Sequence, residues 1–268
     1  MKKPLYLAVI AVLLIVFAVS AVFVGRYLVQ GKQEADRFDE LSQMKDNAAT
    51  QPAVTTVPET TEAPTETTAE TTVPTEPQPL AEYEALHEMN SDMVGWLKIE
   101  GTKLDYPVLQ TPDNPNYYLY RNFDKADSSR GAIYAREECD INEPSDNITI
   151  YGHNMADGSM FAALNNYTNK NTWENNNLII FDTLTEYHTY KIFAVFKTSA
   201  NLGEGFSYHQ FVDAADEKEF NDFVATCKRL SFYDTGITPV YGDKLICLST
   251  CEYTLNNGRL VVAAVRLT

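Results

Sequence analysis

Three residues in the C-terminal half of the chain have side chains that could together perform nucleophilic chemistry. Cys251 lies at the end of an apolar run, and Arg259 follows eight residues later at the start of another. His153 lies upstream, directly after the strand-like residues 147–150. A thiolate is a strong nucleophile, an imidazole exchanges protons near neutral pH, and a guanidinium keeps its charge. These residue types indicate a cysteine transpeptidase or peptidase.

Each of the three residues has a distinct expected role. A free cysteine titrates near about pH 8.5 and a free histidine near about 6.5, so an uncoupled pair would be only about 1% thiolate and imidazolium. Attraction between the two charges, and a nearby cation such as Arg259, raise that fraction. Cys251 would then attack a carbonyl, His153 would protonate the leaving amine, and Arg259 would stabilise the oxyanion. The acyl-thioester formed in this way would transfer to an amine or to water.

A β-rich domain over residues 80–268 has to position these side chains. Residues 80–93 and 213–230 have the apolar spacing of helices, and Asp213 can cap the second of them. The predicted strands are residues 95–99, 105–109, 131–135, 148–151, 177–181, 189–196, 244–251 and 259–267. Many short strands with few helices favour a closed β-barrel or a sandwich.

The run Leu248-Ser249-Thr250-Cys251, with Arg259 after it and Tyr151-Gly152-His153 before it, resembles the sortases. Class B is the most similar. The resemblance covers residues 80–268 and implies a mainly β fold. That fold is a closed eight-stranded barrel with N-terminal helices, Cys on the seventh strand, Arg on the eighth, and a long helix inserted before the Cys strand. It further implies that Ser249 contacts substrate, because class B members line the sorting-signal groove with this strand.

Two features depart from the class B pattern. Cys247 stands where class B commonly has Thr, and the interval from Cys251 to Arg259 is short, which bears on the choice of amine acceptor. Cys247 and Cys251 would lie about 13 Å apart along a strand, too far for a disulfide. A pair between Cys139 and Cys227 remains open, although we favour four free thiols. The four histidines do not pair at ligand spacing, and there is no C-x-x-C, so we expect no metal and no cofactor. We assign structural or surface roles to His87, His188 and His209.

The N-terminal part of the chain predicts an exported, membrane-anchored protein. Residues 5–25 carry no charge and are long enough to span a bilayer, behind a cytoplasmic tip of residues 1–4. A cleaved signal peptide is the alternative. Residues 26–45 form a polar stalk, and residues 46–79, rich in Thr, Pro and Glu, are a predicted disordered linker. We expect residues 1–79 to contribute nothing to the folded core.

The predicted function combines these features. The net charge of −16 argues against nucleic acid as a partner. The sortase resemblance implies cleavage of a Thr-containing sorting signal and transfer to an amine of peptidoglycan, of its lipid-linked precursor, or of a pilin lysine. The enzyme would be a single-pass protein of the cell membrane, with its catalytic domain on the cell-wall side. A papain-like wall peptidase and a non-catalytic tethered binding domain are the alternatives. In papain-like enzymes, however, Cys begins a helix and precedes His.

Overall fold

A computed structural model describes residues 3–50, 78–201 and 203–268. The chain divides into two compact units, Met1–Leu41 and Ser42–Thr268. Helix α1 (Lys3–Ala49) extends past the predicted stalk, so residues 46–49, which we assigned to the linker, are helical. Most of the predicted linker, residues 51–77, lies outside the described residues.

Helix α1 contains one apolar segment long enough to cross a membrane. Its most apolar 18-residue window has a mean hydropathy of 2.6. This segment is compatible with the predicted anchor, and equally with a signal sequence, because length and composition alone define both.

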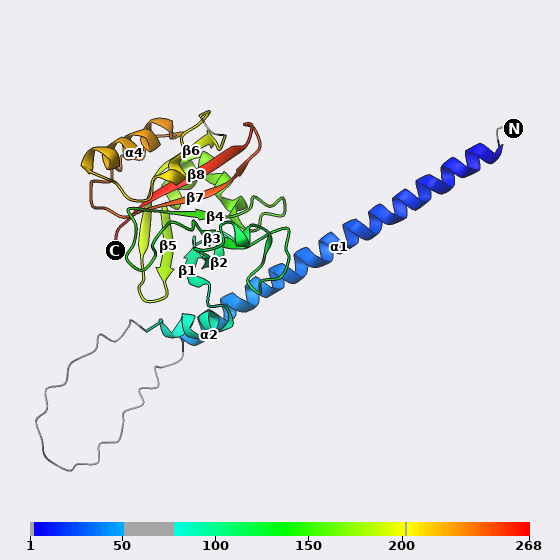
Figure 1. The fold of residues 1–268 in the computed structure, drawn as a ribbon, viewed down its shortest axis with the longest axis horizontal. Helices are drawn as coiled ribbons and strands as arrows, with labels where there is room; N and C mark the ends of the chain where they lie inside the picture. Colours follow the sequence, from blue (N-terminus) through cyan, green and yellow to red (C-terminus); the bar gives the residue numbers. More distant parts are fainter. Residues whose placement is uncertain (1–2, 51–77, 202) are drawn as a thin grey trace, which may run out of the picture. The chain divides into compact units, whose positions relative to one another are not determined.

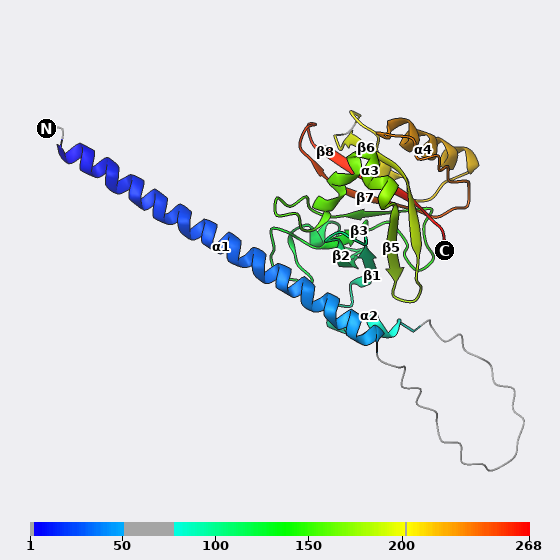
Figure 2. The same ribbon diagram turned by 180° about the vertical axis from the view of Figure 1, so that it is seen from behind.

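The second unit is built on a closed eight-stranded barrel, as the resemblance implied (Figures 1 and 2). Its strands are β1 (Met93–Lys98), β2 (Asp105–Leu109), β3 (Ile133–Ala135), β4 (Asn147–Tyr151), β5 (Leu178–Thr183), β6 (Thr189–Ser199), β7 (Leu245–Glu252) and β8 (Gly258–Arg266). Their order around the barrel is β1-β2-β3-β4-β7-β8-β6-β5. The β2–β3 and β4–β7 pairs are parallel and the others are antiparallel, so β7 has a parallel neighbour on one side and an antiparallel one on the other.

Helix α4 (Glu217–Leu230) is the predicted long helix before the Cys strand, and it covers β6, β7 and β8 from outside the barrel. Phe220, Phe223, Val224 and Cys227 form its buried face, as their spacing predicted. The predicted cap was wrong. Asp216 caps the helix by accepting the backbone N–H of Glu219 at 2.8 Å. Asp213 instead accepts the backbone N–H of Asp146 at 3.0 Å and joins the loop before α4 to the residue that precedes β4.

The first helix of the domain is shorter than predicted. Helix α2 (Ala81–Met89) ends at Asn90, whose extended backbone turns the chain so that Met93 begins β1. The buried Asn90 amide donates to the Tyr118 hydroxyl at 2.9 Å and to the Phe123 carbonyl at 2.8 Å. These hydrogen bonds to distant residues end the helix at Asn90, although the apolar spacing predicted that it would continue to residue 93. Short helices complete the unit: α3 (Lys170–Asn175) and the 3₁₀ turns η1 (Tyr117–Tyr120), η2 (Phe161–Thr168) and η3 (Tyr208–Gln210).

The last turns of α1 belong to the barrel unit and not to a separate stalk. Asp105 on β2 accepts the Trp96 indole N–H at 2.5 Å, Lys45 Nζ at 3.2 Å and Ser42 Oγ at 3.4 Å. Lys45 is 8% exposed and lies 4.5 Å above the centroid of the Trp96 ring. Our expectation that residues 1–79 contribute nothing to the core was therefore wrong for residues 42–49.

We expect Asp105→Ala to lower the free energy of unfolding by about 1–3 kcal/mol, because it leaves the buried Trp96 N–H without its acceptor and removes the nearer of the two carboxylates that pair with the Lys45 ammonium. Asp113→Ala, at an exposed carboxylate in the following loop, is the control and should change it by less than about 0.5 kcal/mol. Urea unfolding of both variants measures the difference. Equal stabilities would mean that the α1 end does not contribute to the domain.

Candidate active site

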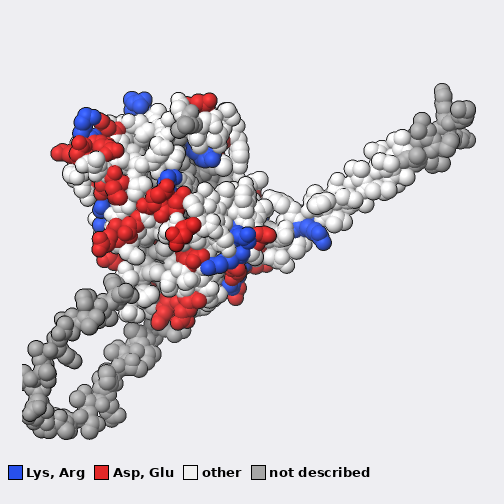
Figure 3. Space-filling view, in the orientation of Figure 1, with Lys and Arg blue, Asp and Glu red and all other residues white. Residues whose placement is uncertain are grey.

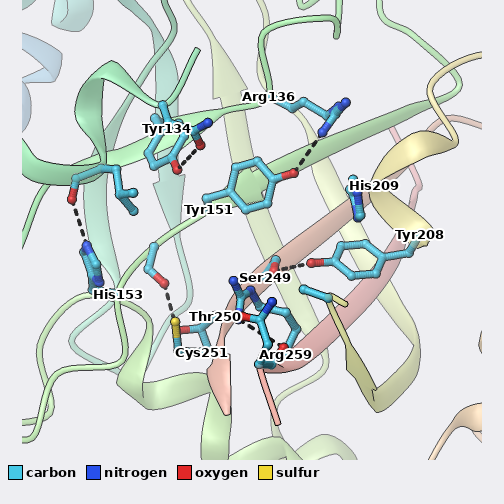
Figure 4. Close-up of a pocket in the computed structure, with 15 residues that line it drawn as sticks. Tyr134, Arg136, Tyr151, His153, Tyr208, His209, Ser249, Thr250, Cys251 and Arg259 are labelled. Carbon is cyan, nitrogen blue, oxygen red and sulfur yellow. Dashed lines mark hydrogen bonds between the residues drawn. The ribbon is translucent and has the colours of Figure 1, made fainter. Parts of the chain in front are cut away.

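The three predicted catalytic residues line one groove of about 340 Å³ at the end of the barrel. Figure 4 shows Cys251 between His153 on one side and Arg259 on the other. The other lining residues are Asn116, Leu119, Tyr134, Arg136, Tyr151, Gly152, Ala200, Tyr208, His209, Ser249, Thr250 and Asn257. The groove holds a nucleophile, an imidazole and a guanidinium together.

Cys251 and Arg259 face each other across the antiparallel β7–β8 pair, where they are register partners. Cα atoms of such partners lie about 4.5–5.5 Å apart, so the thiol and the start of the Arg side chain are neighbours. All four cysteines are free, and Cys139, Cys227 and Cys247 are buried whereas Cys251 is partly exposed. Burial raises the pKa of the Cys139 thiol to about 11 and that of Cys247 still higher. Cys251 is therefore the thiol that a substrate can reach.

Glu252, which sequence reasoning missed, holds the turn between the two strands. Its buried carboxylate accepts Lys197 Nζ at 2.7 Å and the backbone N–H groups of Thr254 at 3.0 Å and Leu255 at 3.2 Å. Burial acts to raise the pKa of Glu252, but the bonds from Lys197 and Thr254 outweigh it and lower that pKa to about 2. The carboxylate thus stays charged and fixes the turn that leads from Cys251 to Arg259.

The parallel pairing of β4 with β7 brings His153 to the same end of the barrel. Tyr151 is the register partner of Ser249, and the Gly152 N–H donates to the Ser249 carbonyl at 3.2 Å. Glycine at position 152 leaves room for the Phe161 ring, since a Cβ there would lie 2.7 Å and 2.8 Å from two of its carbons. His153 Nε2 lies 2.8 Å from the Leu119 carbonyl oxygen. Since a carbonyl only accepts, Nε2 donates in this contact, which leaves Nδ1 as the ring nitrogen without this bond.

Asn154 ties the histidine loop to the cysteine strand. Its Nδ2 donates to the Cys251 carbonyl at 3.0 Å, and its Oδ1 accepts Asn165 Nδ2 at 2.9 Å. This amide fixes the position of the chain after His153 relative to Cys251. The sequence offered no signal for it, because its two partners are distant along the chain.

The Arg259 guanidinium is held from one side only. Its Nη1 donates to the Gly258 carbonyl at 2.9 Å and to Asn257 Oδ1 at 3.1 Å. Within the described part of the chain, Nη2 and Nε make no hydrogen bond. These two donors are therefore available to an oxygen atom of a bound substrate.

Ser249 lines the groove but is only 1% exposed. Its hydroxyl shares a 2.5 Å hydrogen bond with the Tyr208 hydroxyl, and burial raises the pKa of Tyr208, which keeps that phenol neutral. A substrate contact by Ser249 would have to share or replace this bond. Thr250, also a groove residue, is 2% exposed, and its hydroxyl donates to the Gly152 carbonyl at 2.8 Å.

The structure adds two groove residues whose side chains can carry positive charge and that sequence reasoning missed. His209, to which we assigned a structural role, lines the groove from η3, and Arg136 lines it from the end of β3 (Figure 4). No local pattern marks either residue, since each reaches the groove only through the closure of the barrel. Within the described residues, no group of three His, Cys, Asp or Glu side chains could hold a metal ion.

We expect Glu252→Gln to destabilise the domain at pH 7 by about 1–3 kcal/mol, because it removes the charged acceptor of Lys197. The depressed pKa means that the wild-type contribution is complete above the unfolded value near 4.5 and disappears as the pH falls toward 2. The gap between variant and wild type should therefore narrow below about pH 4.5. Chemical unfolding between pH 7 and 3.5 tests this, with exposed Glu143→Gln as the control. A gap independent of pH would contradict it.

Comparison with known proteins identifies the family. The sortase domain model matches residues 97–267. Sortase B of Listeria monocytogenes is 36% identical over 185 residues, which are 68% of this chain and 72% of the relative. Sortase B of Staphylococcus aureus is 29% identical over 185 residues, covering 68% and 73%.

Solved structures agree with this assignment. A Staphylococcus aureus sortase B–substrate complex matches with a TM-score of 0.74 at 25% identity, over 90% of this chain and 99% of the other. A mutant form of Clostridium perfringens sortase B matches with a TM-score of 0.64 at 28% identity, over 70% and 87%. With its closed barrel and its helix before the cysteine strand, the chain belongs to the sortase family of cysteine transpeptidases, in class B.

Proposed function

We propose that this sortase cleaves a Thr-containing sorting signal of exported proteins and transfers the product to an amine of the cell wall or to a pilin lysine. The observation that carries the proposal is the groove in which Cys251, its cross-strand partner Arg259 and His153 meet. A Staphylococcus aureus relative has been solved as a substrate complex. By analogy, the groove here takes the sorting-signal peptide.

The first half-reaction forms an acyl-thioester on Cys251. The thiolate attacks the carbonyl carbon of the scissile bond, and Arg259 donates to the oxygen as it becomes negative. His153 gives a proton to the leaving nitrogen as the C–N bond breaks. The C-terminal part of the signal leaves as a free amine, and the rest stays bound to sulfur.

The second half-reaction transfers the acyl group. An incoming amine attacks the thioester carbonyl, His153 takes up its proton, and Cys251 leaves as a thiolate. Arg259 stabilises the same oxyanion again. The acceptor would be an amine of peptidoglycan, of a lipid-linked wall precursor, or of a pilin.

We place the enzyme in the cell membrane, with its N-terminus inside and the barrel on the wall side. The apolar window of α1 supports a single membrane span. Lys2 and Lys3 precede the apolar run, which favours a cytoplasmic N-terminus. Wall acceptors and exported signals would both be reached from that side.

We expect Cys251→Ala to abolish cleavage and transfer while the melting temperature changes little, because the side chain lies at the rim of the groove. Cys247→Ala is the control, since this buried thiol packs with the residues under α4 and touches no part of the groove. Mass spectrometry of the full-length enzyme incubated with a Thr-centred peptide library should detect an acyl adduct on Cys251. An active Cys251→Ala enzyme, or an adduct on another cysteine, would overturn the assignment.

Replacement of Arg259 separates two roles for its charge. If its planar fork holds the oxyanion, Arg259→Ala and Arg259→Lys should each lower turnover by about 10²–10³-fold, because a point charge lacks that geometry. If Arg259 only favours the thiolate through its charge, Lys should keep most of the activity. Turnover and the pH profile of Cys251 alkylation are measured on both variants. Near-normal turnover of Arg259→Lys would remove the oxyanion role.

A further inference from the structure

The groove carries positive charge in an otherwise acidic protein. The chain has a net charge of −16, and acidic side chains spread over the barrel face seen in Figure 3. Four groove residues can carry positive charge: Arg136, His153, His209 and Arg259. No Asp or Glu lines this groove among the described residues. Such a contrast favours ligands that bring negative charge.

His153 and Arg259, which lie beside Cys251, have roles in the proposed reaction. Arg136 has none. It follows β3 and lies across the groove from Cys251, beyond the Tyr151 ring (Figure 4). A guanidinium in that place is not needed to form or break the thioester. Its position instead suits a part of a substrate remote from the scissile bond.

The hydrogen bonds of Arg136 leave donor capacity unused. Nη2 pairs with Glu138 at 2.8 Å, and Nη1 makes only a long 3.5 Å contact with the Tyr151 hydroxyl. Nε is buried and has no partner among the described residues. The side chain is 19% exposed, whereas that of Glu138 is 51% exposed, so water weakens that ion pair. A buried donor without a partner carries a desolvation cost that an incoming carboxylate would relieve.

The positive charges in the groove change the pKa of His209. Burial and the positive charges of Arg136 and Arg259 lower its pKa, while Glu138 acts weakly in the opposite direction. The lowered pKa favours the neutral form of His209, and no carboxylate among the described groove residues supplies a counter-ion to the two guanidinium groups. An anion bound there would favour both the guanidinium groups and a protonated His209.

We propose that Arg136, with His209, forms a carboxylate-binding subsite in the groove, which selects a substrate bearing an acidic group away from the reacting carbonyl. This inference rests on the proposed function, since it names a preference within the same groove. The carboxylate could belong to an Asp or Glu of the sorting-signal peptide or to the molecule that supplies the amine. A guanidinium binds a planar carboxylate through two parallel N–H donors, a geometry that lysine lacks.

The test compares pairs of substrates that differ only in a carboxylate, using the full-length enzyme in detergent micelles. One arm uses the Thr-centred peptide library with Asp or Glu against Asn or Gln at each other position, and measures the rate of acyl-thioester formation on Cys251. The other arm uses Nα-acetyl-lysine against Nα-acetyl-lysinamide as the amine, and measures the rate of product formation. A preference in the first arm assigns the subsite to the peptide, and one in the second arm assigns it to the acceptor.

We expect the wild-type enzyme to use the carboxylate member about fivefold faster or more in one arm. Arg136→Gln should bring that ratio close to one. Arg229→Gln, at an exposed arginine of α4 outside the groove, should keep the wild-type ratio. A ratio compares two substrates on one enzyme, so a loss of folded protein cancels. A ratio near one in wild type, or a preference that survives Arg136→Gln, would overturn the proposal.

A binding measurement separates failure of the subsite from failure of the reaction. Cys251→Ala, with and without Arg136→Gln, is titrated calorimetrically with the acidic and the amide peptide pools and with the two lysine derivatives. If no thioester forms but the acidic ligands still bind more tightly through Arg136, the subsite stands and the transpeptidation proposal fails. Equal binding of acidic and amide ligands would remove the subsite whether or not thioester forms.

Discussion

The site depends on the position of β7 between two strands of opposite direction. Its parallel neighbour β4 ends at the same end of the barrel as β7, so the residues after β4 emerge beside Cys251. Its antiparallel neighbour β8 starts where β7 ends, so Arg259 is paired directly with Cys251. With these two neighbours, β7 brings Cys251 together with His153, which is 98 positions earlier in the sequence, and with Arg259, which is eight positions later. Backbone hydrogen bonds set this geometry, which makes it largely independent of the side chains in the groove.

Polar side chains then fix the loops at the ends of these strands, which the backbone hydrogen bonds between strands do not hold. Glu252 holds the turn after Cys251, and Asn154 ties the histidine loop to the Cys251 carbonyl. Both make more than one hydrogen bond from a partly or fully buried position, where such bonds are strong and costly to leave unmade. A transpeptidase has to keep its nucleophile, proton carrier and oxyanion donor aligned through two half-reactions. These side chains provide that alignment without contacting the reacting atoms in the proposed scheme.

Charge divides the molecule into two parts with different tasks. Acidic side chains spread over the barrel face seen in Figure 3, whereas the groove contains arginine and histidine and, among the described residues, no carboxylate. The Asp105 cluster near the end of α1 shows the opposite arrangement, since there a carboxylate gathers Trp96, Lys45 and Ser42. In the groove the positive charge is available to a ligand. In the Asp105 cluster the positive charge of Lys45 pairs with a carboxylate and holds the end of α1 against the barrel. The difference lies in whether the protein supplies the counter-ion.

The sequence by itself indicated a cysteine enzyme and determined the order of the elements. Cys251, His153 and Arg259 could be chosen because their types and their places beside apolar runs are local signals, and the strands and α4 follow from periodicity. Tertiary structure alone decided the rest. Asn90 ends α2 early because Tyr118 and Phe123 offer it partners. Asp216 caps α4, whereas Asp213 bonds to Asp146, a residue distant in the sequence. Arg136 and His209 became groove residues only when the barrel closed, because it brings together segments that no local pattern relates. Glu252 holds its turn through local bonds to Thr254 and Leu255, and only its bond to Lys197 needed the tertiary structure.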